Sequence, residues 1–212
     1  MYCFLGASGA GETTVIDLFL GFIKPTSGRA LINGVEVAVN PLEAKKYVSY
    51  CSEDVALYSH FTARENLDFF VKLGCKPGLK KDDYYAVLRE VGLQENAFER
   101  KTRFFSKGKQ QKVCIAIAMM RDTPAILLDE PTAGLDPKVS EELMENLDQL
   151  RRRGKAILIA THDIFRVKEI ADRVGIIKEG RKVLERTREE LERENLQALY
   201  LDYMCNAYRT GR

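Results

Sequence analysis

Short strand-like runs alternate with longer amphipathic stretches along most of the chain. The runs at 2–5, 47–51, 125–128 and 156–160 have the length of strands, and the last two are almost wholly apolar, as in strands buried on both faces of a parallel sheet. Apolar positions three or four residues apart predict helices between them, for example over 139–152. This alternation indicates an α/β fold with a mostly parallel sheet.

One long stretch carries helical patterns without a strand. Thr62-Ala63-Arg64-Glu65 has the form of a capping box that starts a helix. A second helix is expected over about 82–91, and Ser106 can cap a third that runs through 113–120. We therefore predict an all-helical lobe, over about 62–121, inserted into the α/β core.

Two hairpins and a terminal helix complete the predicted architecture. Asn33-Gly34 is a strong hairpin signal between two short runs. Glu179-Gly180 similarly separates 174–178 from 181–184. A charged helix from about Arg188 to Tyr203 is expected within a C-terminal extension over 187–212. With 212 residues and no linker or repeat, the chain is expected to form a single domain.

Charge and cysteine usage exclude several classes of function. The net charge is +2, and Arg151–Arg153 suits the end of a helix, so no nucleic-acid partner is expected. No apolar run reaches membrane-spanning length and no secretory signal is visible, so direct membrane insertion is not expected. Wide cysteine spacing predicts neither a disulfide framework nor a zinc site, and favours a reducing compartment. The five cysteines are Cys3, Cys51, Cys75, Cys114 and Cys205.

A glycine-rich segment lies between the first strand and the first helix. Backbone N–H groups in such a loop, with the positive end of the following helix, bind phosphate. Gly6, Gly11 and Thr13 meet the spacing G-x-x-x-x-G-K-[ST], but Glu12 stands where that pattern has lysine. The predicted loop consists of Gly6, Ala7, Ser8, Gly9, Ala10, Gly11, Glu12, Thr13 and Thr14.

Polar residues that can bind metal or activate water also follow two later strands. The run 125–128 ends in Asp129 and Glu130, and 156–160 is followed closely by His162. Carboxyl ends of parallel strands form the crevice in which open α/β sheets bind ligands. One acid can hold Mg²⁺ while the other activates a water. The alternatives are a solvated loop for the acid pair and a capped or solvated histidine for His162.

Taken together, these motifs resemble the ATP-binding subunit of an ABC transporter, of the type paired with ABC-2 export permeases, whose signature often reads S-K-G. The resemblance implies a P-loop NTPase fold with a RecA-like, mostly parallel sheet core. It also implies a cytoplasmic protein, peripheral on the cytoplasmic face of the membrane through a separate permease. The motifs in order are Gly6–Thr14, Glu53, Ser106–Gln110, Asp129-Glu130, Asp136 and His162.

The resemblance also implies roles for single residues. Glu130 would be the general base, and His162 would contact the γ-phosphate of ATP. Thr13, Glu53 and Asp129 would hold Mg²⁺. A second ABC ATP-binding subunit would pair head to tail, with Asp136 at the seam, while the helical lobe contacts the permease. The signature that reaches the partner's ATP would be Ser106, Lys107, Gly108, Lys109 and Gln110.

Three departures from the family pattern leave two hypotheses open. Glu12 replaces a lysine, and a unit charge pair at about 4 Å is worth about 4 kcal/mol at a dielectric near 20. Glu53 stands where the family usually has glutamine. The chain begins one strand before the loop, without the aromatic residue that stacks on adenine, which suggests N-terminal truncation. The chain is then either an active ATPase or a degenerate, non-hydrolysing subunit that completes its partner's ATP site.

Aromatic pairs in the predicted lobe offer an alternative chemistry. Tyr84-Tyr85 and Phe104-Phe105 could form base-stacking platforms. We interpret both pairs instead as core and lobe packing.

Overall fold

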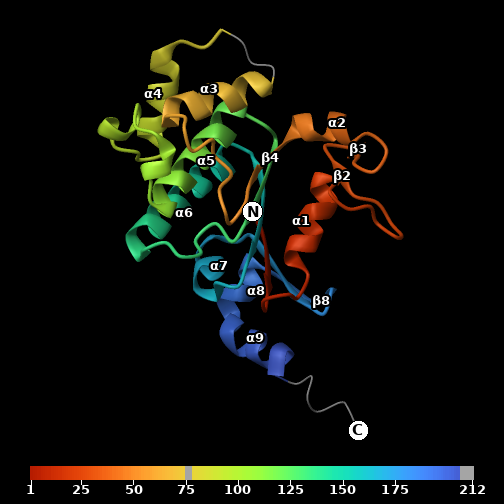
Figure 1. The fold of residues 1–212 in the computed structure, drawn as a ribbon. Helices are drawn as coiled ribbons and strands as arrows, with labels where there is room; N and C mark the ends of the chain where they lie inside the picture. Colours follow the sequence, from red (N-terminus) through yellow and green to blue (C-terminus); the bar gives the residue numbers. More distant parts are fainter. Residues whose placement is uncertain (75–77, 206–212) are drawn as a thin grey trace.

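A six-stranded sheet forms the centre of the computed structural model, which describes residues 1–74 and 78–205 (Figure 1). The strand order is β4-β5-β6-β1-β7-β8, and only β8 runs antiparallel to its neighbour. The predicted mostly parallel sheet is therefore confirmed. Its strands are β1 (Tyr2–Gly6), β4 (Val48–Cys51), β5 (Ala125–Asp129), β6 (Ala156–Thr161), β7 (Arg173–Lys178) and β8 (Arg181–Thr187).

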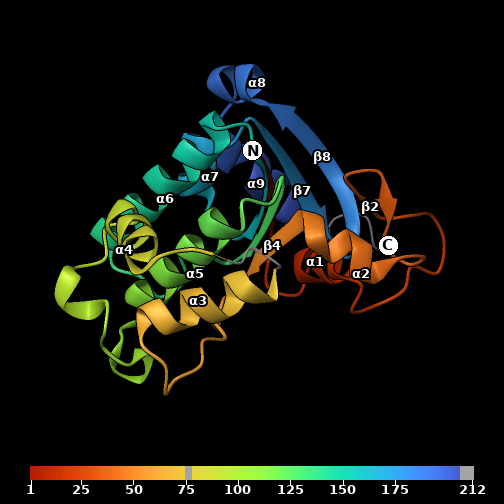
Figure 2. The same cartoon turned by 90° about the horizontal axis from the view of Figure 1, so that it is seen from above.

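Helices cover both faces of this sheet (Figure 2). On one face, α1 (Glu12–Leu20) packs Ile16 and Leu20 against Leu127 and Ala160. The short α2 (Pro41–Ala44) lies beside α1, next to the hairpin of β2 (Leu31–Ile32) and β3 (Val35–Glu36). On the other face lie α6 (Pro137–Arg152) and α7 (Ile164–Ile170), and α6 buries Leu143 and Leu147. The apolar periodicity of each helix thus matches the face that it buries.

The helical lobe follows β4 and precedes β5. It contains α3 (Ala63–Leu73), α4 (Lys81–Glu90) and α5 (Lys107–Arg121), with α3 and α4 against α5. The predicted capping box opens α3, because Thr62 and Glu65 exchange side-chain to backbone hydrogen bonds of 2.8 and 3.1 Å. The short 3₁₀ turns η2 (Glu95–Ala97) and η3 (Thr102–Phe104) connect α4 to α5.

The predicted terminal helix is in fact two helices, α8 (Arg188–Arg193) and α9 (Leu196–Cys205). Between them Glu194 is extended, and its carboxylate accepts a 2.8 Å bond from Arg186. The Asn195 side chain then accepts a 3.1 Å bond from the N–H of Ala198, which starts the new helix. A capping residue inside the charged run therefore ended one helix and began another. Residues 206–212 of the predicted extension lie outside the described residues.

The expectation that the cysteines stay unpaired is wrong for one pair. Cys51 on β4 and Cys114 on α5 form a disulfide, with Cα atoms 6.0 Å apart. A separation of 63 residues gives no sign of this contact, which arises because α5 packs on β4. Cys3 is free and buried. Cys75 and the side chain of Cys205 lie outside the described part of the chain.

The aromatic pairs before α5 divide between core and surface. Phe105 is buried, whereas Phe104 is 55% exposed, so the predicted core packing holds for Phe105 and not for Phe104. The guanidinium groups of Arg103 and Arg100 lie 4.7 and 5.5 Å from the ring centre of Phe104. These cation–π contacts accommodate an aromatic ring at the surface.

No helix within residues 1–74 and 78–205 is long and apolar enough to span a membrane.

Candidate functional site

The predicted motifs meet at one edge of the sheet. β1, β5 and β6 are parallel, and their last residues are Gly6, Asp129 and Thr161. The phosphate loop, the acid pair and His162 each follow one of these strands. The sequence prediction that strand ends bring these groups together is therefore confirmed by the topology.

The glycine-rich loop between β1 and α1 is tightly wrapped. The N–H of Ala10 donates to the carbonyl of Ala7 at 2.8 Å, and the N–H of Gly180 donates to the carbonyl of Ala10 at 2.7 Å. Gly9 and Gly11 have φ values of 82° and 116°, a region that side chains disfavour. These two glycines allow the loop to curve around its own N–H groups.

The Glu12 side chain turns back into this loop. A Cβ added to Gly6 would lie 1.8 Å from Glu12 Oε1, so the carboxylate lies directly against Gly6. Burial raises the pKa of Glu12, as do the nearby carboxylates of Glu130 and Asp129. The backbone N–H groups of Glu12 and Gly11 favour the charged form of this carboxylate and so oppose that rise in pKa. The first departure noted in the sequence therefore lies inside the predicted phosphate loop.

Asp129 and Thr13 form a small oxygen-rich site. Thr13 Oγ1 donates to Asp129 Oδ1 at 3.3 Å, and Asp129 is buried. Burial raises the pKa of Asp129, and Glu130, Glu53 and Asp17 raise it further. Two adjacent oxygen ligands in an excess of negative charge fit Mg²⁺, which typically takes one or two protein ligands plus phosphate and water. The described residues hold no cluster of three acidic, histidine or cysteine side chains placed to bind a metal by themselves.

Glu130 is held by several hydrogen bonds in an unusual backbone conformation. Its φ is 45°, and its N–H donates to the carbonyl of Ala160 at 2.8 Å. Thr161 Oγ1 donates to Oε2 at 2.9 Å, and the N–H of His162 donates to Oε1 at 3.0 Å. A left-handed φ at a non-glycine residue is uncommon, and residues in such conformations cluster at functional sites. Sequence reasoning missed Thr161, although its position one residue before His162 was an available signal.

His162 completes a pair with Glu130. The distance from His162 Nδ1 to Glu130 Oε1 is 2.6 Å. The hydrogen bond to Glu130 and its negative charge raise the pKa of His162. A carboxylate with a bound imidazole can orient a water and accept its proton. The two residues face a cleft of about 340 Å³ lined by Glu130, Thr132, Ala133, Gly134, His162, Asp163, Ile164 and Phe165.

The signature segment lies at the start of α5, beside the start of α6. Ser106 is at the N-terminal cap position and exposed, but the predicted side-chain cap does not form. Gly108 is buried against Val139, and a Cβ there would lie 2.6 Å from Val139 Cγ1. Asp136 caps α6 by accepting a 3.0 Å bond from the N–H of Val139. The structure thus brings the signature and the predicted seam residue together.

One departure from the family pattern, Glu53, forms an ion pair with a lysine of the signature. Lys107 Nζ lies 3.3 Å from Glu53 Oε1. Lys107 also lies within 4 Å of the position of a Cβ on Gly134, beside the cleft that Glu130 and His162 line. Glu53 therefore neutralises a signature lysine, in addition to its electrostatic effect on Asp129. Lys109 and Gln110 are half-buried in the same first turn of α5.

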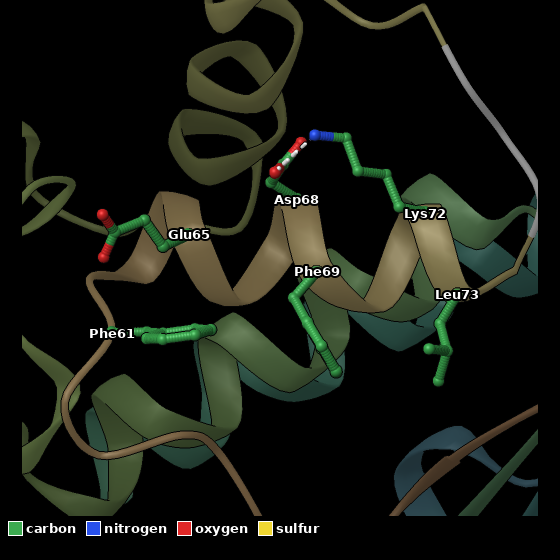
Figure 3. Close-up of a pocket in the computed structure, with 6 residues that line it drawn as sticks. All are labelled: Phe61, Glu65, Asp68, Phe69, Lys72 and Leu73. Carbon is green, nitrogen blue, oxygen red and sulfur yellow. Dashed lines mark hydrogen bonds and ion pairs between the residues drawn. The ribbon is translucent and has the colours of Figure 1, made fainter.

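A second and larger hollow, of about 470 Å³, lies on the helical lobe (Figure 3). Its residues come from α3 and the segment just before it, and the aromatic rings of Phe61 and Phe69 have centres 6.2 Å apart. Tyr58 contacts both rings, at 5.3 and 4.7 Å. The lining consists of Phe61, Glu65, Asp68, Phe69, Lys72 and Leu73.

Comparison with known proteins gives one consistent result. The family model described as ABC transporter matches residues 1–133. The bacitracin transport ATP-binding protein BcrA of Bacillus licheniformis is 36% identical over 208 residues, which are 97% of this chain and 66% of that protein. The thiamine import ATP-binding protein ThiQ of Jannaschia sp. (strain CCS1) is 34% identical over 201 residues, 92% of this chain and 85% of that protein.

A solved structure of similar fold carries reaction products. It is a dimeric ATP-binding cassette in a post-hydrolysis state, bound to ADP and Pi. Its TM-score is 0.79 at 27% identity, over 89% of this chain and 85% of that one. The chain spans only 51–60% of the length of several other curated relatives.

Proposed function

This chain belongs to the ABC transporter family of ATP-binding subunits, a family of ATPases, and from that membership we propose that it binds and hydrolyses ATP to drive export through a separate membrane permease. The observation that carries the proposal is the Glu130–His162 pair at the carboxyl edge of the sheet. BcrA supports the transport role by its name, while ThiQ is named for import. The S-K-G form of Ser106-Lys107-Gly108 favours export.

In the proposed reaction, Glu130 orients the attacking water and accepts its proton. The hydrogen bonds from Thr161 and His162 fix the orientation of the Glu130 carboxylate. His162, held by Glu130, is placed to contact the γ-phosphate. Thr13 and Asp129 would hold Mg²⁺, which supplies positive charge that stabilises the negative charge developing on the phosphate oxygens.

We also propose a head-to-tail dimer, in which each subunit's signature completes the other's site. Ser106 is exposed at the N-terminus of the 15-residue α5, where the positive end of the helix dipole favours phosphate. Asp136, at the start of the neighbouring α6, would lie at the seam. The dimeric cassette bound to ADP and Pi supports this arrangement.

The aromatic hollow of the lobe is our proposed contact with the permease. Leu73 in its lining and Tyr58 beside it are 70% and 48% exposed, and large apolar side chains gathered on a surface typically mark an interaction site. A cytoplasmic segment of the permease would insert an apolar side chain between Phe61 and Phe69. The chain would then work at the cytoplasmic face of the membrane without entering it.

A second candidate function rests on Glu12. With a carboxylate in its own phosphate loop, the chain could serve as a non-hydrolysing subunit. It would donate Ser106–Gln110 to the ATP site of an active partner.

The Mg²⁺-dependent ATPase activity of the purified chain decides between the two functions. Wild type is compared with Glu12→Lys, and Glu130→Gln provides the blank. Turnover by wild type above the blank supports the enzyme. Turnover only in Glu12→Lys, with stimulation of a partner's ATPase by wild type, supports the non-hydrolysing subunit. If neither protein turns over ATP and neither stimulates a partner, both proposals fail.

A further inference from the structure

The phosphate loop already contains a negatively charged group of its own chain. Glu12 Oε1 lies over Gly6, and its Cδ would be 2.7 Å from a Cβ placed there. The backbone N–H groups of Gly11 and Glu12 lie beside the carboxylate and favour its charged form, which opposes the rise in its pKa that burial causes. These are N–H groups of the kind that a glycine-rich loop offers to a phosphate.

The surrounding contacts hold the loop in this shape. The Ala7–Ala10 turn closes one side, and Gly180, at the β7–β8 turn, binds the carbonyl of Ala10. The Cα of Gly180 lies 3.3 Å from where a Cβ of Gly11 would be, so the loop has little room on that side. The loop is thus formed around a carboxylate and keeps the geometry that receives an anion.

A phosphate does not fit this loop while the side chain stays there, because both would need the same space and the same donors. We propose that Glu12 is an internal ligand of the loop, which competes with the phosphate groups of a nucleotide for the N–H groups of Gly11 and Glu12. The competition for phosphate rests on the proposed nucleotide site. Glu12 is the first residue of α1 and only half-buried, so its side chain can rotate out when an anion enters.

Occupation of the phosphate loop by the Glu12 side chain differs from simple charge repulsion of phosphate in one testable respect. Repulsion depends on the charge, whereas occupation depends on the reach of the side chain. Glu12→Asp keeps the charge but lacks the methylene needed to return to the same N–H groups. Asp17→Asn is the matched control, because it removes a negative charge on the same helix that also acts on Asp129.

The first measurement uses no nucleotide. Amide hydrogen exchange is followed by NMR in the full-length chain for wild type, Glu12→Ala and Glu12→Asp. A charged hydrogen bond is worth about tenfold or more in an equilibrium, so protection of the Gly11 amide should fall about tenfold in both variants. The Ala10 amide, bonded to Ala7, should keep its protection and reports an intact loop. Equal protection of Gly11 in all three proteins would overturn the proposal.

The second measurement titrates inorganic pyrophosphate by calorimetry. Occupation predicts that Glu12→Asp binds pyrophosphate about tenfold more tightly than wild type, with Asp17→Asn close to wild type. Equal binding by wild type and Glu12→Asp overturns the competition, even if Glu12→Lys is an active ATPase. Conversely, tighter pyrophosphate binding without ATP turnover in any variant supports the internal ligand and refutes hydrolysis. The two proposals can therefore fail separately.

Discussion

Adding one methyl group to the signature glycine tests how α5 and α6 fit together. In an ordinary helix, Gly→Ala stabilises by about 1 kcal/mol. At Gly108 the new Cβ would lie 2.6 Å from Val139 Cγ1, well inside van der Waals contact. Overpacking of this kind typically costs about 1–3 kcal/mol. Since the steric cost exceeds the helical gain, we expect Gly108→Ala to lower the free energy of unfolding by about 1 kcal/mol.

Urea unfolding followed by circular dichroism measures this change, and Val139→Ala provides the control background. Without the Val139 methyl groups the clash disappears, so Gly108→Ala should then stabilise the chain. The double-mutant cycle should give a coupling energy of about 1–3 kcal/mol. A Gly108→Ala single variant more stable than wild type by about 1 kcal/mol would show that the α5–α6 contact does not exclude a side chain, and the reasoning would be refuted.

Three further predictions follow from the contacts described. Reduction with dithiothreitol should destabilise wild type by about 4 kcal/mol, because the Cys51–Cys114 disulfide closes a loop of 63 residues; an unchanged urea midpoint would contradict the disulfide. Glu130→Gln should move the pKa of His162 back toward about 6.5, measured by imidazole NMR, because the raised pKa comes from Glu130; an unmoved titration curve would contradict the pairing. In the lobe, Arg64 and Tyr85 donate hydrogen bonds of 2.8 and 2.6 Å to Glu99, and Lys81 lies 3.3 Å from its carboxylate. Despite partial burial, these groups lower the pKa of Glu99 to about 2, so its contribution to stability is present above about pH 4.5 and is lost as the pH falls through about 2. Glu99 is 42% exposed, so Glu99→Gln should cost only about 1 kcal/mol at pH 7, and a difference that persists at pH 2 would argue against the ion pairs.

The sequence predicted the arrangement of the site better than its internal contacts. The positions of Asp129 and His162 follow from strand ends, because a buried parallel strand leaves its carboxyl end at one edge of the sheet. The direction of the Glu12 side chain could not be predicted from the sequence, because it depends on where the N–H groups of the loop point after folding. The Cys51–Cys114 pair likewise depends on a helix packing against a strand across the inserted lobe.

Local polar signals were also ambiguous in the sequence. Ser106 has the right identity for a helix cap and occupies the cap position, yet its side chain makes no capping bond. Asn195 lies inside a charged run that looked like one helix, and its own capping bond divides that run. Whether a polar side chain bonds to the adjacent backbone is decided by tertiary surroundings, which a sequence pattern does not contain.

The insertion of the lobe between two neighbouring strands has a mechanical consequence. β4 and β5 are neighbouring parallel strands, so the lobe leaves the sheet at the carboxyl end of β4 and re-enters it at the amino end of β5. The Cys51–Cys114 bond joins α5 to the last residue of β4, at the point where the lobe leaves the sheet. A force applied at the aromatic hollow would therefore reach the sheet through β4 and β5, and the carboxyl ends of these two strands carry Glu53 and Asp129.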